Sequence, residues 1–170
     1  MSNFYKSPQS QLGKTEYANL QIVALSGRIG RLRFLVYSFF LGLLGLAAEQ
    51  VLSNLLPFDL LLMDSAVDWS VGGVTLIGAL ILTIRRLQDV EHHPLLCLIM
   101  FLPIINLLFW LYLLLAPGSE FANSYGLPPP PNPPGMGWLA ALAILCTAGV
   151  FLLFFGSIFA LLMFFTAGSW

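Results

Sequence analysis

The chain has 170 residues, of which 58% are hydrophobic and only 9% are charged, and its mean hydropathy is +0.87. A soluble domain typically carries about 25% charged residues, so this composition excludes an ordinary soluble domain and indicates an integral membrane protein. The net charge of -1 says little more, because the positions of the few cations orient a membrane protein, rather than their sum.

Residues 1–25 form a polar N-terminal tail in which no hydrophobic period of 2 or 3.6 persists. We expect a loosely ordered cytoplasmic tail. The alternative is a docking segment, since residues 3–8 resemble the Asn-Pro-Tyr-x-x-Pro stretch at the start of various bacterial membrane proteins. The first thirty residues lack an apolar core followed by a small-residue cleavage site, so we expect no removable signal peptide.

Three arginines, Arg28, Arg31 and Arg33, stand directly before the first apolar run. Forked guanidinium groups can reach lipid phosphates while their stems lie along the interface. The arginines therefore predict contact with anionic phospholipid headgroups, and a more specific lipid or partner site is the alternative. Because this patch leads into a membrane span, no nucleic-acid partner is expected.

The first span runs from about Phe34 to Leu56, which suits the roughly 20 residues that a bilayer core requires. Ser38 and Gly42 lie four residues apart and form a small-residue face suited to close helix contact. Glu49 lies within the apolar run, about 22 Å along the helix from its start. A carboxylate inside a membrane marks a functional site by default, although Glu49 can also simply face headgroup water.

Residues 57–69 carry three aspartates and no cation, and we interpret them as a solvated acidic loop on the outer side. A second span follows from about Val71 to Ile84, which is short for a full crossing. It ends directly on a charged island, residues 85–94.

Within the island, Arg85 and Arg86 precede Asp89 by four and three residues. A helix that continues through the island would pair them, so these three residues are a candidate structural ion pair. His92 and His93 are adjacent and do not face one another on a helix, so neither a metal site nor a cofactor is predicted.

The third span runs from about Leu95 to Leu115, with Pro103 near its middle. Proline removes one backbone hydrogen bond and predicts a kink there. Asn106 follows three residues later and is, with Glu49, a candidate intramembrane polar site.

A proline-rich linker over residues 128–137 is expected to be extended polyproline II, and a fourth span runs from about Trp138 to Phe165. The sequence thus predicts an all-α membrane protein with a bundle of four transmembrane helices. Its parts are a tail (1–25), a three-span core (26–127), the linker (128–137) and an additional C-terminal helix (138–170).

All seven Lys and Arg residues lie before the first span or directly after the second. The positive-inside rule therefore places both termini and the charged island in the cytoplasm, and the acidic loop and the proline-rich linker outside. The chain is therefore expected to cross its membrane several times.

Three blocks of the sequence resemble a bacterial inner-membrane family known as domain of unknown function 805. Gly27-Arg28-Ile29-Gly30-Arg31 resembles the family's Gly-Arg-x-x-Arg, and Arg85-Arg86-Leu87-Gln88-Asp89 is similar to its Arg-Arg-Leu-His-Asp, with Gln88 in place of the histidine. The third block has Pro-Gly, four residues, then Asn-x-aromatic-Gly. It is matched here by Pro117, Gly118, Asn123, Tyr125 and Gly126, which suit a turn or a helix cap.

The resemblance implies a helical membrane core over residues 26–127 and a location in the bacterial inner membrane. It leaves the activity open. The chain offers no recognisable set of catalytic residues, so we favour a non-catalytic membrane protein with a structural, accessory or assembly role, partnered by lipid, by copies of itself or by a larger membrane complex. One alternative is a small oligomeric transporter or channel for a proton or small solute that uses Glu49 and Asn106. A second alternative is a lipid-modifying enzyme.

Overall fold

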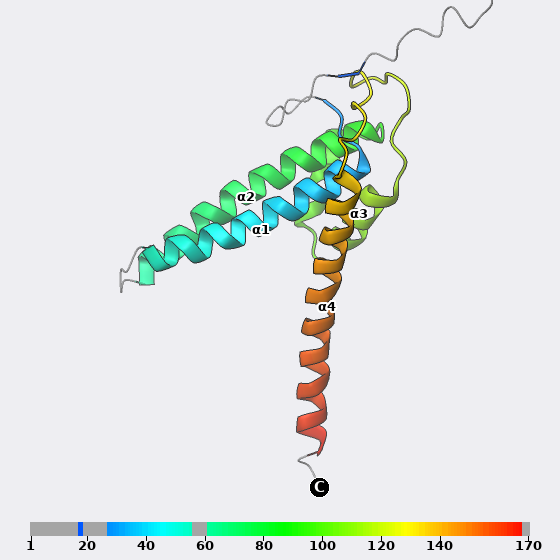
Figure 1. Ribbon diagram of the computed structural model, residues 1–170. Helices are drawn as coiled ribbons and strands as arrows, with labels where there is room; N and C mark the ends of the chain where they lie inside the picture. Colours follow the sequence, from blue (N-terminus) through cyan, green and yellow to red (C-terminus); the bar gives the residue numbers. More distant parts are fainter. Residues whose placement is uncertain (1–16, 19–26, 56–60, 168–170) are drawn as a thin grey trace, which may run out of the picture. The chain divides into compact units, whose positions relative to one another are not determined.

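The computed structural model describes Tyr17, Ala18, residues 27–55 and residues 61–167, with the side chains of residues 61–64 and 167 left undescribed. Its helices are α1 (Arg31–Leu55), α2 (Leu61–Asp89), the 3-10 helix η2 (Pro94–Phe101), α3 (Ile105–Leu115) and α4 (Met136–Ala167) (Figure 1). No strand occurs among these residues, and the predicted all-α class is confirmed. The interpretation of residues 3–8 as a docking segment falls outside the described residues.

The chain divides into two compact units. Of the described residues, the first unit contains Tyr17, Ala18, residues 27–31 and Leu80–Pro131. The second contains residues 32–55, 61–79 and 132–167.

In the second unit, α1 and α2 run side by side as an antiparallel pair (Figure 1). Two glycines permit the close approach. A Cβ atom on Gly45 would lie 2.7 Å from Thr75 Oγ1, and one on Gly78 would lie 2.9 Å from Leu41 Cδ2. Gly42, which the sequence suggested for close contact, has nothing within 4 Å of its Cβ position, so the face of α1 that packs on α2 contains Leu41 and Gly45 instead.

Helix α2 is longer at both ends than the span predicted over residues 71–84. Most of the acidic segment that was predicted as a loop belongs to the helix, which begins at Leu61. At the other end the helix continues through the charged island, and Glu91 adopts φ 62° just beyond it. His92 N–H donates to Leu87 O at 2.9 Å and Glu91 N–H to Gln88 O at 3.3 Å. This pair of hydrogen bonds is a Schellman motif, which satisfies the last carbonyl groups of the helix.

The predicted third span is not one kinked helix. It consists of η2, a break at residues 102–104 and the short helix α3. Leu102 precedes a proline, a position biased away from helical conformation, and it has φ -92° and ψ 110°. Ile104 then takes φ 70°. Proline therefore ends the first helix and redirects the chain, where the sequence predicted only a bend.

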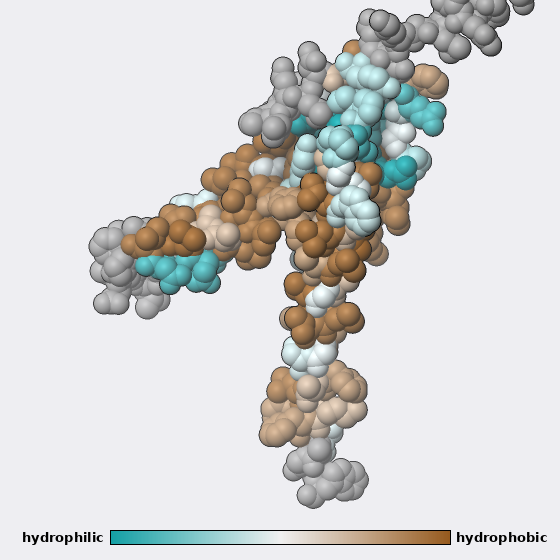
Figure 2. All heavy atoms as spheres, viewed as in Figure 1, coloured by the Kyte–Doolittle hydropathy of each residue, from teal (hydrophilic) through white to brown (hydrophobic). Residues whose placement is uncertain are grey.

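Among the residues that the structure describes, three helices are long and apolar enough to cross a membrane: Arg31–Leu55, Ser65–Asp89 and Met136–Thr166. Residues Ile105–Leu115 form a shorter apolar helix. These three helices correspond to the first, second and fourth predicted spans. The predicted third span has no helix long enough to cross a membrane. Figure 2 shows that α4 is hydrophobic along most of its visible length.

Candidate functional site

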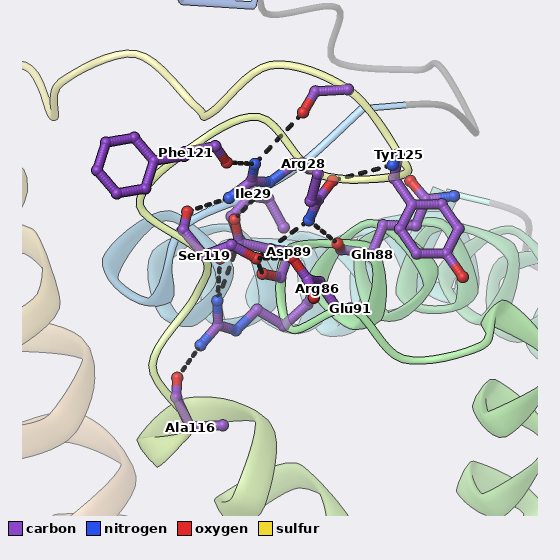
Figure 3. Close-up of polar contacts among 12 residues, drawn as sticks. Arg28, Ile29, Arg86, Gln88, Asp89, Glu91, Ala116, Ser119, Phe121 and Tyr125 are labelled. Atoms are coloured by element: carbon purple, nitrogen blue, oxygen red, sulfur yellow. Dashed lines mark hydrogen bonds and ion pairs between the residues drawn. The ribbon is translucent and has the colours of Figure 1, made fainter.

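The three sequence blocks that carry the family resemblance meet in the first unit around the carboxylate of Asp89. We call this cluster the polar cap, and it comprises Arg28, Arg86, Asp89 and residues 116–126 (Figure 3). The charged groups are buried: Arg28 is 1% exposed, Arg86 0% and Asp89 2%. Such burial is rare for arginine and aspartate unless they are paired, and here each of them is.

Arg28 binds both the carboxylate and the loop that follows α3. Its Nε donates to Asp89 Oδ1 at 3.1 Å. Its NH1 donates to Phe121 O at 2.6 Å and to Gly126 O at 3.3 Å, and its NH2 donates to Ser119 O. One guanidinium group therefore organises the carbonyl oxygens of a whole loop.

Arg86 binds the other oxygen of the same carboxylate and closes the end of α3. Its NH1 donates to Asp89 Oδ2, one helical turn further along α2, and at 3.4 Å to Ile29 O. Its Nε donates to Leu113 O at 2.8 Å, and its NH2 donates to Ala116 O. Because the last carbonyl groups of a helix lack partners within it, a cation placed there satisfies them and complements the helix dipole.

The loop around Arg28 is closed by Asn123 and Gly126. Their backbone groups exchange two hydrogen bonds of 3.0 Å each, and Tyr125 N–H donates to Asn123 Oδ1 at 2.9 Å. Asn123 Nδ2 also donates to Gln88 O at 3.0 Å, which fixes the turn to the end of α2. Gly126 has φ 123°, a conformation that residues with a side chain rarely adopt.

Gly118 lets the loop approach Asp89. A Cβ atom on Gly118 would lie 2.7 Å from Asp89 Cγ and closer still to Oδ2. In the first block, Gly27 has φ 114°, and its Cβ position is 3.7 Å from Arg85 NH2. A side chain would therefore collide with Asp89 at Gly118 and would strain the backbone at Gly27.

The charge balance of the cap explains its many carbonyl contacts. Two guanidinium groups face one carboxylate, which leaves one positive charge buried without a counter-charge within the cluster. An uncompensated buried charge is costly. Each arginine also donates to three backbone carbonyl oxygens, whose dipoles supply the missing negative potential.

The remaining candidate residues from the sequence lie in different surroundings. Arg31 is exposed, whereas Arg33 and Arg85 are buried. Glu49 is exposed on α1 in the second unit, and Asn106 is half-buried in the first turn of α3 in the first unit. In the part of the chain that the structure describes, no three His, Cys, Asp or Glu side chains gather into a metal site.

The cap also contains partners that sequence reasoning missed. Ser119 N–H donates to Asp89 O at 2.9 Å, and its hydroxyl donates at 3.0 Å to Glu91 Oε1. The residues after α3 therefore lie beside the end of α2, although the sequence predicted them on the opposite side of the membrane. The available signal was the membership of these residues in the three resembling blocks, because blocks far apart in a chain can share one site.

Comparison with known proteins agrees with this geometry. Residues 22–127, more than half of the chain, match the family described as "Protein of unknown function (DUF805)". No curated protein and no solved structure matches the chain. The matched range contains all of the buried charged groups of the polar cap and ends one residue after Gly126. The chain is a member of the DUF805 family.

Proposed function

We propose that this chain is a non-catalytic integral protein of the bacterial inner membrane that serves as a structural or accessory component of a larger membrane complex. The observation that carries the proposal is the way the polar cap uses its charged groups. The guanidinium donors of Arg28 and Arg86 point at Asp89 and at backbone carbonyl oxygens of the same chain. A site built for a substrate would direct such groups into a cavity.

Three long apolar helices support the membrane location. The cations of the described chain lie at the start of α1 and the end of α2. By the positive-inside rule, this end of both helices faces the cytoplasm. The exposed Arg31 can then bind the phosphate of an anionic phospholipid, an expectation that no longer extends to the buried Arg28 and Arg33.

The apolar surface of α4 supports a role in assembly. Its 32 residues correspond to about 48 Å of helix, which exceeds the roughly 30 Å of a hydrocarbon core and requires tilt or contact outside the core. The family match ends at residue 127, so α4 lies outside it. A helix that lies outside the family's part of the chain, and whose side chains from Val150 to Thr166 are all exposed, suits contact with another membrane protein.

The test is purification of the tagged chain from its native membrane directly into nanodiscs, followed by mass spectrometry. The proposal predicts a stoichiometric membrane protein that co-purifies. An unrelated tagged membrane protein of similar size is the control for carry-over. Absence of any stoichiometric partner would contradict the accessory role.

A flux assay separates this role from the transport alternative. The purified chain and its Glu49→Gln variant are reconstituted in liposomes with a pH-sensitive dye inside. We expect both to be as impermeable to protons as empty liposomes. Proton flux through the parent chain that Glu49→Gln abolishes would overturn the non-catalytic, structural role and favour a transporter.

A further inference from the structure

We propose that residues 94–115, here called the re-entrant hairpin, dip into the leaflet next to the polar cap and return to the same side, with lipid acyl chains around their tip. This inference rests on the proposed membrane location. It changes the number of crossings from four to three and identifies a surface of the chain that meets hydrocarbon rather than protein.

The two ends of the re-entrant hairpin are held together beside the polar cap. Just before the hairpin, His92 Nε2 lies 2.6 Å from the hydroxyl of Tyr112, and the two rings are stacked. At its far end, Leu113 O accepts from Arg86 Nε at 2.8 Å. A segment whose two ends meet at one place cannot carry the chain across a bilayer.

The lengths of the two limbs suit half of a bilayer. The eight residues of η2 rise about 16 Å at roughly 2.0 Å per residue of 3-10 helix. The 11 residues of α3 rise about 16 Å at 1.5 Å per residue. Both values are close to half of the roughly 30 Å hydrocarbon core, so a hairpin standing upright on the cap reaches about the midplane.

The backbone at the tip is largely paired within the hairpin, as hydrocarbon requires. Leu102 N–H donates to Ile99 O at 3.0 Å, Ile105 N–H to Pro103 O at 2.8 Å, and Asn106 N–H to Leu102 O at 2.9 Å. Pro103 has no N–H group to satisfy. The turn therefore supplies most of the backbone hydrogen bonds that a segment needs in hydrocarbon, a requirement that continuous helices normally meet.

The residue at the tip identifies the surroundings. Ile104 has φ 70° and is 84% exposed. A β-branched residue at positive φ is an outlier in water and in lipid alike, so the exposed side chain, rather than the backbone, is what identifies them. A water-facing turn favours glycine or a polar residue, whereas a large exposed apolar side chain suits hydrocarbon. Residues 94–119 contain no charged side chain, and the exposed apolar residues of the hairpin include Leu95, Leu98, Phe101, Ile104, Leu107 and Leu108.

The topology of the remaining chain follows from the hairpin. Arg28 binds residues up to Gly126, and Ala18 N–H donates to Pro128 O at 3.1 Å, so residues 117–128 stay on the cap side. Only residues 132–135 separate the first unit from α4, and four extended residues reach about 14 Å at most. Helix α4 must enter the membrane from the cap side, and its C-terminal end then lies on the opposite side.

The experiment uses the full-length chain with both native cysteines replaced, Cys97→Ala and Cys146→Ala. Four single-cysteine variants are made in this background. Glu120→Cys reports on the cap loop, Asn54→Cys on the far end of α1, Thr166→Cys on the end of α4, and Ile104→Cys on the hairpin tip. Phe101→Cys is a second tip variant in case Ile104→Cys does not fold, and all variants must elute like the parent.

A membrane-impermeant maleimide in right-side-out vesicles reports the side of each residue. We expect Asn54→Cys and Thr166→Cys to react in intact vesicles, and Glu120→Cys to react only after permeabilisation. Reaction of Glu120→Cys in intact vesicles together with Asn54→Cys would mean that residues 94–115 cross the membrane, and it would overturn the inference.

A nitroxide spin label at the tip reports its depth and its neighbours. We expect a label at Ile104→Cys to relax strongly with dissolved oxygen and weakly with a water-soluble nickel chelate, as at the bilayer midplane. Strong relaxation by the chelate would place the tip in water and overturn the inference. Weak relaxation by both reagents would mean that protein covers the tip, in place of lipid, and would also overturn it.

These outcomes differ from failure of the membrane location itself. If alkaline carbonate extracts the parent chain from vesicles, both the membrane location and the hairpin are wrong. If the chain resists extraction and the tip is accessible to the chelate, only the hairpin is wrong.

Discussion

Asp89 Oδ1 accepts a hydrogen bond from Arg28 Nε at 3.1 Å, although the two residues are 61 positions apart in the chain. The other oxygen of the same carboxylate is bound to Arg86, three residues away on α2. One buried carboxylate therefore joins the segment before α1 to the end of α2, and through Arg86 it reaches the end of α3.

Replacing Arg86 with lysine is expected to destabilise the fold. An ammonium group has no planar fork, so it cannot bind Asp89, Leu113 O and Ala116 O together. Loss of two buried hydrogen bonds to a charged group lowers the free energy of unfolding by about 3 kcal/mol. The melting temperature in detergent is expected to fall accordingly. The exposed Arg31 provides the control, because Arg31→Lys is expected to melt within about 2 °C of the parent. Equal melting of Arg86→Lys and Arg31→Lys would refute the role of the fork.

Gly118→Ala is expected to destabilise the polar cap, because the added methyl group would overlap the Asp89 carboxylate. Overpacking of this kind costs about 1–3 kcal/mol, and displacing the carboxylate from its arginines adds to it. The control is Gly72→Ala, at a helical position with nothing within 4 Å of the Cβ site, where alanine is expected to stabilise the helix by up to about 1 kcal/mol. Opposite shifts in melting temperature are the predicted result.

Gly45→Ala is expected to loosen the contact of α1 with α2, since its methyl group would lie 2.7 Å from Thr75 Oγ1. We expect a loss of about 1 kcal/mol. Thr75→Ala removes the colliding atoms, so the double variant is expected to recover most of the lost stability in a double-mutant cycle. Gly42→Ala, at a position with open space, is the control. If the stability changes of Gly45→Ala and Thr75→Ala are additive, the two residues do not contact one another, and this account of the packing of α1 on α2 is wrong.

Glu91 holds the left-handed position that ends α2, with φ 62°. A β-branched residue is disfavoured there, so Glu91→Val is expected to lower the stability by about 1–2 kcal/mol. Glu91→Gly relieves the backbone at the cost of an exposed hydrogen bond to Ser119 and is expected to melt close to the parent. If Glu91→Val and Glu91→Gly lower the melting temperature equally, the effect comes from the lost glutamate side chain rather than from the backbone.

The sequence predicted those features of the fold that depend on local patterns. Long apolar runs predicted α1, α2 and α4, and the spacing of Arg86 and Asp89 indicated a pair on one helical face. The contact of Arg28 with Asp89 has no local signature, since nothing in the periodicity of either segment refers to the other. Only the shared membership of both residues in the resembling blocks pointed to it.

The segment over residues 95–115 shows why hydropathy predicted one long helix where the structure has two short ones. Its length and apolar character suit a full crossing, and a single proline in such a helix is usually read as a kink. The difference lies in Leu102 and Ile104, whose backbone angles turn the chain back. The ties that keep its ends together come from Arg86 and His92, which lie outside the apolar run.

The melting temperature of Asp89→Asn, measured beside that of Asp68→Asn, tests most directly the claim that one carboxylate holds the cap together. Asparagine keeps the shape of the side chain and removes its charge, which leaves Arg28 and Arg86 buried without a counter-ion. Breaking a buried ion pair in this way costs about 3–5 kcal/mol, a fall in melting temperature of about 10 °C for a chain of this size. Asp68, exposed on the same helix, is expected to change it by about 2 °C or less. Equal melting of the two variants would contradict the claim that Asp89 organises the fold.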